Sequence, residues 1–272
     1  MNQRTLVPSL LFILLVSSIL TAKQTPDSSN NRLATVLHLP VLTTNDWQVL
    51  FQEAESGNPE AQYWLARIYD AGKLLPKDAE ESVHWYQKSA EQGYAPAEYL
   101  LCLMQANRED LKSERCMWRA AEKGVPEAQF WIGVAYDQQL WFGIRDKQEA
   151  IKWFRQAAAR GYVDAEAELG QCYERGDGVE QNYALAAEWY RKAAEHVPNL
   201  GGAGQGRNSL GLLYVDGLGV PKNYVQAYMW FSLAGTEANL AAVQVEMTPA
   251  EILKAQQMAD EWKKRHPDPA IY

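Results

Sequence analysis

A pattern that returns about every 36 residues constrains the fold of this 272-residue chain more than any other feature. Four segments align on aromatic residues followed by alanine, namely WYQKSAEQGYAPAEYLL (85–101), MWRAAEKGVPEAQFWIG (117–133), WFRQAAARGYVDAEAELG (153–170) and WYRKAAEHVPN (189–199). Glycines recur in step with them, at Gly57, Gly93, Gly124 and Gly161. A helical pattern with such a period is typical of a stack of helix pairs.

Each repeat is expected to hold two helices, which we call helix A and helix B. In the first repeat, helix A is predicted at residues 59–71, because apolar residues return there every three or four positions. Its predicted apolar face is Ala61, Leu65, Ile68 and Tyr69. Helix B is predicted at residues 77–92, with a buried face of Val83, Tyr86 and Ala90 and with Trp85 beside it. No strand pattern of similar strength occurs, so the sequence predicts an all-α fold.

The repeats resemble the SEL-like repeat family, whose pattern is A-x-x-x-L-[GA]-x-x-Y-x-x-G-x-G-V followed by A-x-x-W-[YF]-x-[KQ]-A-A-x-x-G. The best-matching positions are Ala165, Leu169, Gly170, Tyr173, Gly176, Gly178, Val179, Ala186, Trp189, Tyr190, Ala193 and Ala194. The resemblance implies an α/α solenoid, a superhelix of stacked antiparallel helix pairs related to tetratricopeptide repeats. About five such repeats are expected at residues 45–240, followed by a capping helix at 248–266 and a tail at 267–272.

The second repeat departs from this pattern. It is about five residues short, its Gly-x-Gly turn is missing, and Gln105 and Cys116 stand where Tyr and Trp are expected. Cys102 takes the close-packed glycine position of helix A, which faces the Cys116 position of helix B. The pair is either a disulfide, if the Cα atoms come within ~7 Å, or two buried thiols. Cys172 is expected to be a free, buried thiol.

The N-terminus has the layout of a secretory signal peptide. Arg4 supplies a positive charge, residues 6–20 are apolar, and Ala22 offers a small residue before a cleavage point. We therefore expect a signal peptide at residues 1–22, a flexible linker at 23–44 and a periplasmic or secreted protein. The alternative is an uncleaved membrane anchor, although the apolar stretch is shorter than the ~20 residues that a spanning helix needs.

Composition and motifs argue against several other classes of function. The net charge is −8 and no cluster of Lys and Arg stands out, so nucleic acid is not an expected partner. The four histidines lie far apart and none belongs to a metal-ligand pattern, so neither a metal nor another cofactor is expected.

The segment GGAGQGRNS at residues 201–209 is close to a phosphate-binding loop, but it follows a helix, and such a loop must follow a strand. We interpret its glycines as an insertion that lengthens the turn between two repeats.

A partner-binding face is expected where the family places its A helices, on the concave side of the solenoid. In each of the first three repeats two bulky residues precede the Leu or Ile of helix A, namely Tyr63-Trp64, Tyr99-Leu100 and Phe130-Trp131. The first of each pair is expected to pack between repeats, and the second to be exposed. Trp64, Leu100 and Trp131, with Arg67 as a polar contact, are the predicted binding residues for a protein or peptide.

The expected function is therefore that of a non-enzymatic repeat scaffold in the cell envelope or outside the cell. The alternative is a cell-wall protein that binds or weakly hydrolyses peptidoglycan or β-lactams, as in a cysteine-rich bacterial branch of the family. That branch pairs cysteines at positions that fall near Ala90 and Glu98 here, and the chain has no S-x-x-K or K-T-G motif.

Overall fold

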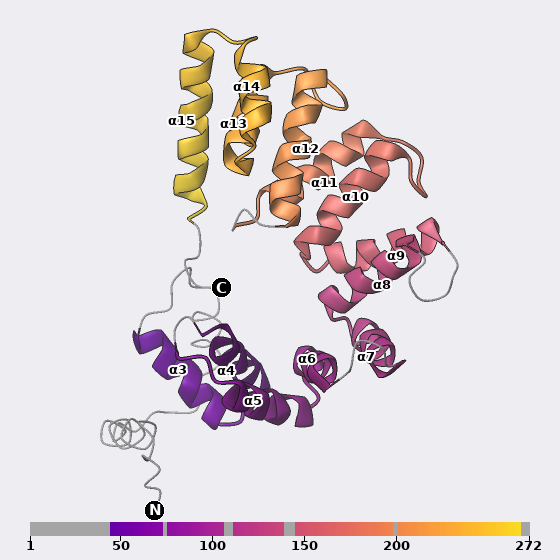
Figure 1. The fold of residues 1–272 in the computed structure, drawn as a ribbon, viewed down its shortest axis with the longest axis vertical. Helices are drawn as coiled ribbons and strands as arrows, with labels where there is room; N and C mark the ends of the chain where they lie inside the picture. The colour runs from indigo at the N-terminus through magenta and orange to yellow at the C-terminus, as the bar shows by residue number, and fades with distance from the viewer. Residues whose placement is uncertain (1–43, 73–74, 106–110, 139–144, 198–200, 268–272) are drawn as a thin grey trace, which may run out of the picture.

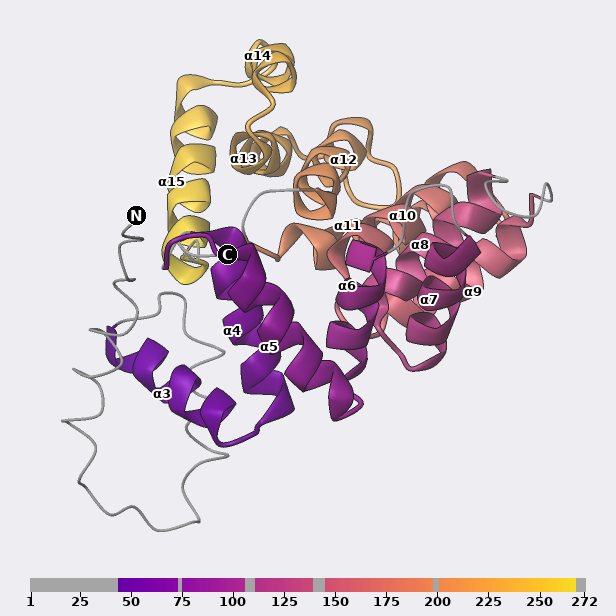
Figure 2. The ribbon, with the colours of Figure 1, turned by 60° about the horizontal axis from the view of Figure 1, so that its bottom comes forward.

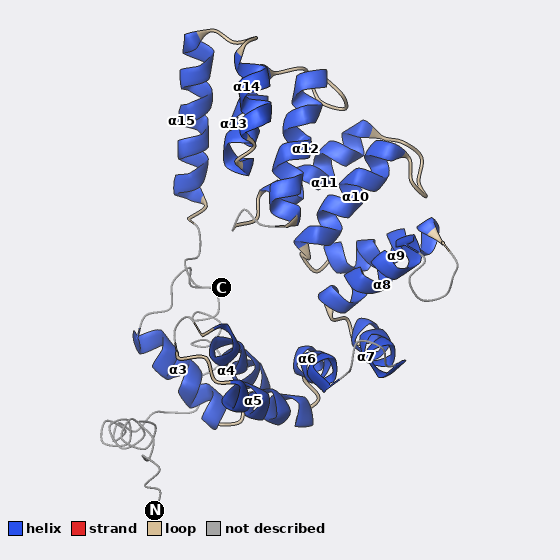
Figure 3. Cartoon of the chain, viewed as in Figure 1, coloured by secondary structure: helices blue, strands red, loops and turns tan. Residues whose placement is uncertain are grey.

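The computed structural model describes residues 44–267 apart from 73–74, 106–110, 139–144 and 198–200, and this part of the chain contains helices and no strand (Figure 3). The helices are α3 (Thr44–Glu55), α4 (Pro59–Ala71), α5 (Ala79–Glu91), α6 (Ala95–Gln105), α7 (Leu111–Glu122), α8 (Pro126–Gln138), α9 (Lys147–Ala158), α10 (Val163–Arg175), α11 (Tyr183–Ala194), α12 (Gly202–Asp216), α13 (Tyr224–Ala234), α14 (Glu237–Gln244) and α15 (Pro249–Arg265). The signal peptide, almost all of the linker, most of the tail and the A–B connection of the second repeat lie outside the described residues. The predicted all-α solenoid is confirmed.

The helices are stacked along an open arc (Figure 1). Five helix pairs follow one another, from α4 with α5 to α12 with α13, while α3 packs on α4 at one end and α15 packs on α13 at the other (Figure 2). In the second and third pairs, α6 and α8 lie on the inner side of the arc and α7 and α9 on the outer side (Figure 1). This part of the arc therefore has the inward-facing A helices that the family resemblance implied.

Polar caps fix where many of the helices begin. Asx side chains accept backbone N–H groups at the starts of five helices, namely Asn58, Asp78, Asp146, Asn182 and Asn223. Glycines in the left-handed conformation end α4, α10, α12 and α13, where a side chain would be strained. The sequence thus sets both ends of a repeat locally, before the pairs are packed together.

Within a pair, glycine on helix A lets an aromatic ring of helix B come close. A Cβ atom at Gly170 would lie 2.5 Å from the ring of Tyr190, a distance that real side chains do not adopt. The same relation joins Gly133 to Phe154 and Gly211 to Phe231. Glycine at this position of helix A therefore allows a close approach of helix B in the last three repeats.

The buried face of helix B in the first repeat differs from the prediction. The residues buried in α5 are Ser82, Trp85, Tyr86 and Ser89, whereas Val83 and Ala90 are only half-buried. Ser89 is buried because its hydroxyl donates to the carbonyl of Pro59, 2.6 Å away in helix A. A serine that caps a neighbouring backbone carbonyl can occupy a core position, and a search for apolar periodicity alone misses it.

The glycines of the GGAGQGRNS segment lie mostly inside a helix, so the interpretation as a lengthened turn was wrong. α12 begins at Gly202, and only Gly201 precedes it, with a positive φ. A Cβ at Gly202 would lie 2.5 Å from the carbonyl oxygen of Val163, and one at Gly206 would lie 2.8 Å from the carbonyl oxygen of Tyr190. The glycines therefore bring α12 against the backbone of α10 and α11, and steric need outweighs their poor helix propensity.

Arg207, in the same segment, is a structural residue. It is 2% exposed, and its guanidinium donates to the carbonyl oxygens of Ala194, His196 and Leu233. It also stacks on the ring of Trp262, with 4.5 Å between its Cζ atom and the ring centroid. A buried guanidinium is tolerated here because carbonyls near the ends of α11 and α13 accept its hydrogen bonds.

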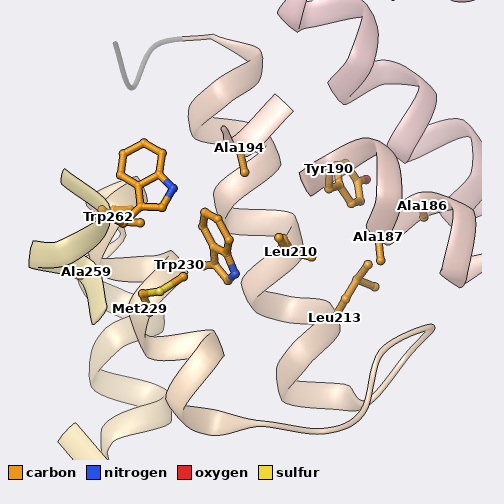
Figure 4. Packing of buried hydrophobic residues seen from close by; sticks show 11 residues of the cluster. Ala186, Ala187, Tyr190, Ala194, Leu210, Leu213, Met229, Trp230, Ala259 and Trp262 are labelled. Atoms are coloured by element: carbon orange, nitrogen blue, oxygen red, sulfur yellow. The ribbon is translucent and has the colours of Figure 1, made fainter. Parts of the chain in front are cut away.

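The C-terminal end of the array is closed by α15. Trp262 of α15 and Trp230 of α13 meet edge to face, with ring centroids 6.5 Å apart, over Met229 and Leu210 (Figure 4). The helix begins with a capping box, in which Thr248 and Glu251 exchange hydrogen bonds with each other's backbone. α15 thus covers the apolar face that the last repeat would otherwise expose, as a terminal cap of a solenoid must.

Candidate partner-binding face

The first residue of each aromatic pair packs between repeats. Tyr99 and Phe130 are buried, and Tyr63 is half-buried. The ring of Tyr63 contacts Tyr94, which begins the next repeat, with centroids 5.5 Å apart. Phe130 contacts Tyr162 in the same way, at 5.1 Å. These residues join neighbouring repeats and are not free to bind a partner.

Of the three residues expected to be exposed, only Trp131 is. Its side chain is 44% exposed, and it is the one aromatic among the five large exposed hydrophobic residues in the described part of the chain. Trp64 and Leu100 are half-buried, contrary to the expectation. Trp64 packs on the first-repeat core and lies under Arg67, and Leu100 packs against the cores of two repeats. The predicted continuous stripe is therefore reduced to one exposed anchor with apolar residues beside it.

Arg67 ties the first repeat to the same face. It donates a 3.3 Å hydrogen bond to the hydroxyl of Tyr63, and its Cζ atom lies 5.6 Å from the centroid of Trp64. Burial raises the pKa of Glu127, which lies on α8, two A helices further along, and the charge of Arg67 partly offsets this rise. Arg67 of α4 and Glu127 of α8 therefore interact electrostatically across the intervening A helix, α6.

Two half-buried carboxylates lie near the exposed Trp131. Glu127 is one turn before Trp131 on α8. Glu168 stands on the next A helix, α10, at the position that corresponds to Trp131. Burial raises the pKa of both carboxyl groups, and the negative charge of Asp164 adds to the rise at each. Within the described ranges, no hydrogen bond or ion pair joins either carboxylate to another side chain. Sequence analysis missed both, although the i, i+4 spacing of Glu127 and Trp131 could have indicated them.

Three tyrosines near this surface lie in buried environments that disfavour ionisation of the phenol. Burial, together with the nearby Glu60 and Tyr63, raises the pKa of Tyr94 to about 12. Burial also raises the pKa of Tyr99 and of Tyr162, with the charge of Glu127 acting in the same direction. These phenols are therefore neutral at physiological pH.

The cysteines divide into one pair and one single thiol. Cys102 of α6 and Cys116 of α7 form a disulfide, with Cα atoms 5.9 Å apart. Cys172 is free and buried, and burial raises the pKa of its thiol to about 12. A thiol with such a pKa is not a reactive nucleophile. The disulfide is a structural element of the shortened second repeat.

Other features of the described residues do not form a site. A shallow hollow runs along α7, lined by Glu114, Arg115, Trp118, Arg119 and Glu122, but all of its walls come from one helix. Three or more histidine, cysteine or acidic side chains do not converge anywhere in the described ranges in a way that could hold a metal ion. None of the described helices is both long enough and apolar enough to cross a bilayer. The exposed surface of α8 around Trp131 is thus the candidate site.

Stacked helix pairs, with glycine–aromatic contacts inside a pair and aromatic contacts between pairs, define an α/α solenoid of the tetratricopeptide-like class. A family model described as Sel1 repeat matches residues 59–94, 126–162, 163–196 and 205–239, more than half of the chain. The chain belongs to the Sel1 repeat family. The matches omit residues 95–125, which are the second repeat with its disulfide.

Relatives with this repeat come from animals, fungi and bacteria. DAP3-binding cell death enhancer 1 of Rattus norvegicus is 32% identical over 164 residues, which cover 56% of this chain and 32% of the relative. Chitin synthase regulatory factor 3 of Schizosaccharomyces pombe is 28% identical, over 52% of this chain and 16% of the relative. The chain thus spans a third or less of these relatives' length.

Solved structures share the fold. The protective antigen c5321 of uropathogenic Escherichia coli superposes with a TM-score of 0.60 and 31% identity, over 82% of this chain and 49% of the antigen. A Sel1 repeat protein from Oxalobacter formigenes gives a TM-score of 0.55 and 26% identity, over 76% of this chain and 89% of that one. The protein is therefore a Sel1 repeat scaffold, a type of fold suited to protein–protein interaction.

Proposed function

We propose that this protein is a non-enzymatic scaffold that binds a segment of a partner protein, or a peptide, on the inner face of its solenoid. The exposure of Trp131 carries the proposal, because a large aromatic side chain left 44% exposed on an A helix is typical of an interaction anchor. Trp64, Arg67 and Leu100 are proposed to extend the surface as half-buried or polar flanks.

Two of the relatives support an interaction role by their names. The rat relative is named for binding DAP3, and the fission yeast relative is named as a regulatory factor of chitin synthase. Both names describe proteins that act through another protein. For the present chain, the residues around Trp131 indicate which kind of partner segment would fit.

We further propose that the protein works in the periplasm or outside the cell. Residues 1–22 have the composition of a signal peptide, and the Cys102–Cys116 disulfide suits an oxidising compartment. Fusing residues 1–44 to alkaline phosphatase, which is active only after export, tests this proposal. Phosphatase activity in bacteria supports it, and an inactive, stable fusion contradicts it.

The binding proposal is tested by affinity purification from the native envelope fraction. The chain from Lys23 serves as bait beside Trp131→Ala, with Leu253→Ala as the control because Leu253 is an exposed apolar residue on α15, outside the proposed face. A partner that wild type and Leu253→Ala enrich and Trp131→Ala loses supports the proposal. Equal recovery by all three baits, with matching helical circular dichroism, contradicts it.

A further inference from the structure

The surroundings of Trp131 indicate what kind of partner the inner face fits. Glu127 lies one turn from Trp131 on α8, and Glu168 holds the same position on α10 that Trp131 holds on α8. Glu127 is thus an i, i+4 neighbour of the exposed indole on α8, and Glu168 stands at the register position of the indole on the next A helix. We propose that this surface binds a cationic segment of a partner polypeptide, with an Arg or Lys side chain lying on Trp131 between Glu127 and Glu168. This inference rests on the proposed function.

The charges around the two carboxylates favour a cation from outside. Asp164 acts on both of them, and Asp137 acts on Glu168. Lys147 also acts on Glu168, but its ammonium group is already bonded to Asp137 at 2.6 Å and to Asp177 at 3.1 Å. The negative charge next to Glu168 is therefore only partly balanced within the chain.

Two arginines, Arg67 and Arg175, also interact electrostatically with the two carboxylates. Arg67 acts on Glu127, but its guanidinium is held by the Tyr63 hydroxyl and the Trp64 ring. Arg175 acts on Glu168 from the last turn of α10 without forming an ion pair with it. Since neither cation pairs directly with Glu127 or Glu168, both carboxylates keep their acceptor oxygens for a bound partner.

The combination of an indole and carboxylates matches arginine and lysine in particular. Both side chains have a long apolar stem that can lie along an aromatic ring while the charged end reaches an acceptor. The planar guanidinium of arginine additionally donates several hydrogen bonds in a fixed geometry. The half-buried setting of the carboxylates strengthens such contacts relative to those on an open surface. The net charge of −8 favours the approach of a cationic segment.

The test selects binders from a phage-displayed library of random peptides. The immobilised baits are wild type, the Glu127→Gln/Glu168→Gln double variant, Trp131→Ala, and Glu188→Gln as a control on an exposed glutamate of α11. We expect wild type and Glu188→Gln to enrich peptides rich in Arg and Lys. Titration calorimetry of a selected peptide should show affinity reduced about tenfold or more in the double glutamine variant and in Trp131→Ala. Replacing the basic residues of the peptide by glutamine should have a similar effect.

The outcomes separate this inference from the proposed function. Peptides that lack basic residues, bind the double glutamine variant as well as wild type, and are lost by Trp131→Ala would overturn the cationic partner and leave the binding face standing. Peptides that bind all four proteins equally would overturn both. Failure to select any peptide with wild type would overturn the cationic segment as the ligand, while the purification experiment above still decides the proposed function.

Discussion

In the fourth repeat Gly170 of α10 lies against the ring of Tyr190 of α11. In the second repeat Cys102 of α6 stands at the position of the glycine, and Met117 of α7 stands at the position of the tyrosine. There Cys102 is bonded to Cys116 instead. The same helix pair is thus held in one case by steric fit and in the other by a covalent bond. The two repeats of this chain thus keep their helices close at this point in two different ways.

The largest expected effect comes from removing the aromatic ring of the fourth repeat. Tyr190→Ala should lower the free energy of unfolding by about 4 kcal/mol, because it leaves a cavity against Gly170 and removes the 2.6 Å hydrogen bond to Glu174. Met117→Ala, at the equivalent position, should cost about 1 kcal/mol, since that side chain is only half-buried. Urea denaturation followed by circular dichroism measures both. Equal losses would contradict the comparison.

Breaking the disulfide should have the next largest effect. The two cysteines are 14 residues apart, and closing a loop of that size stabilises a protein by about 3 kcal/mol. The thermal midpoint should fall when a phosphine reductant is added, and the fall should be absent in the Cys102→Ser/Cys116→Ser variant. Cys172→Ala serves as the control and should keep the sensitivity to the reductant. A thermal midpoint of wild type that does not change on addition of the reductant would show that the disulfide does not stabilise the second repeat.

A smaller loss is expected from adding one carbon atom in the fourth repeat. Gly170→Ala should lower the free energy of unfolding by about 2 kcal/mol, although alanine favours helices, because the new Cβ would overlap the ring of Tyr190. In the first repeat Ala66 already stands at this position, and there Ala66→Gly should cost about 1–2 kcal/mol through helix propensity and the loss of a buried methyl group. A Gly170→Ala variant that is more stable than wild type in urea would show that the helices separate freely.

The smallest effect has the opposite sign and concerns the inner face. Burial raises the pKa of Glu127 and of Glu168, so the folded protein binds protons at these sites more readily than the unfolded chain does. Their ionised forms therefore cost stability at neutral pH, and this cost shrinks as the pH falls through the folded-state pKa. Glu127→Gln and Glu168→Gln should raise the thermal midpoint slightly at pH 7.

The pH dependence gives this prediction its control. The gain from each glutamine should narrow at acidic pH, whereas Glu188→Gln should leave the midpoint unchanged at both pH values. A gain that is the same at acidic and neutral pH would show that the ionised carboxylates are not the cause. A gain in stability together with a loss of peptide binding would mark residues kept for binding.

The sequence predicted what depends on local periodicity and on the repeat. The period near 36, the helix at residues 59–71 and the capping helix near 248–266 could each be predicted from neighbouring residues. Packing between distant segments was harder to predict. The glycines 202 and 206 are helical because α10 and α11 approach α12 closely, and no local pattern contains that information.

The candidate site was predicted only in part, because it too depends on packing between distant segments. The A-helix register identified Trp131 as exposed, but it also predicted exposure for Trp64 and Leu100, whose burial depends on neighbouring helices. Glu127 and Glu168 were missed because an acidic residue in a helix is most often solvated, whereas both carboxylates are half-buried in the folded protein.

Photo-crosslinking from position 131 in living cells tests the central claim most directly. Benzoylphenylalanine is introduced at Trp131, and in a second strain at Leu253, which is 56% exposed on α15 and lies away from the inner face. The account predicts that irradiation joins a partner to the chain from position 131 and not from position 253, and that mass spectrometry finds the contact in a segment rich in Arg and Lys. Crosslinks from position 253 alone, or none from position 131, would contradict it.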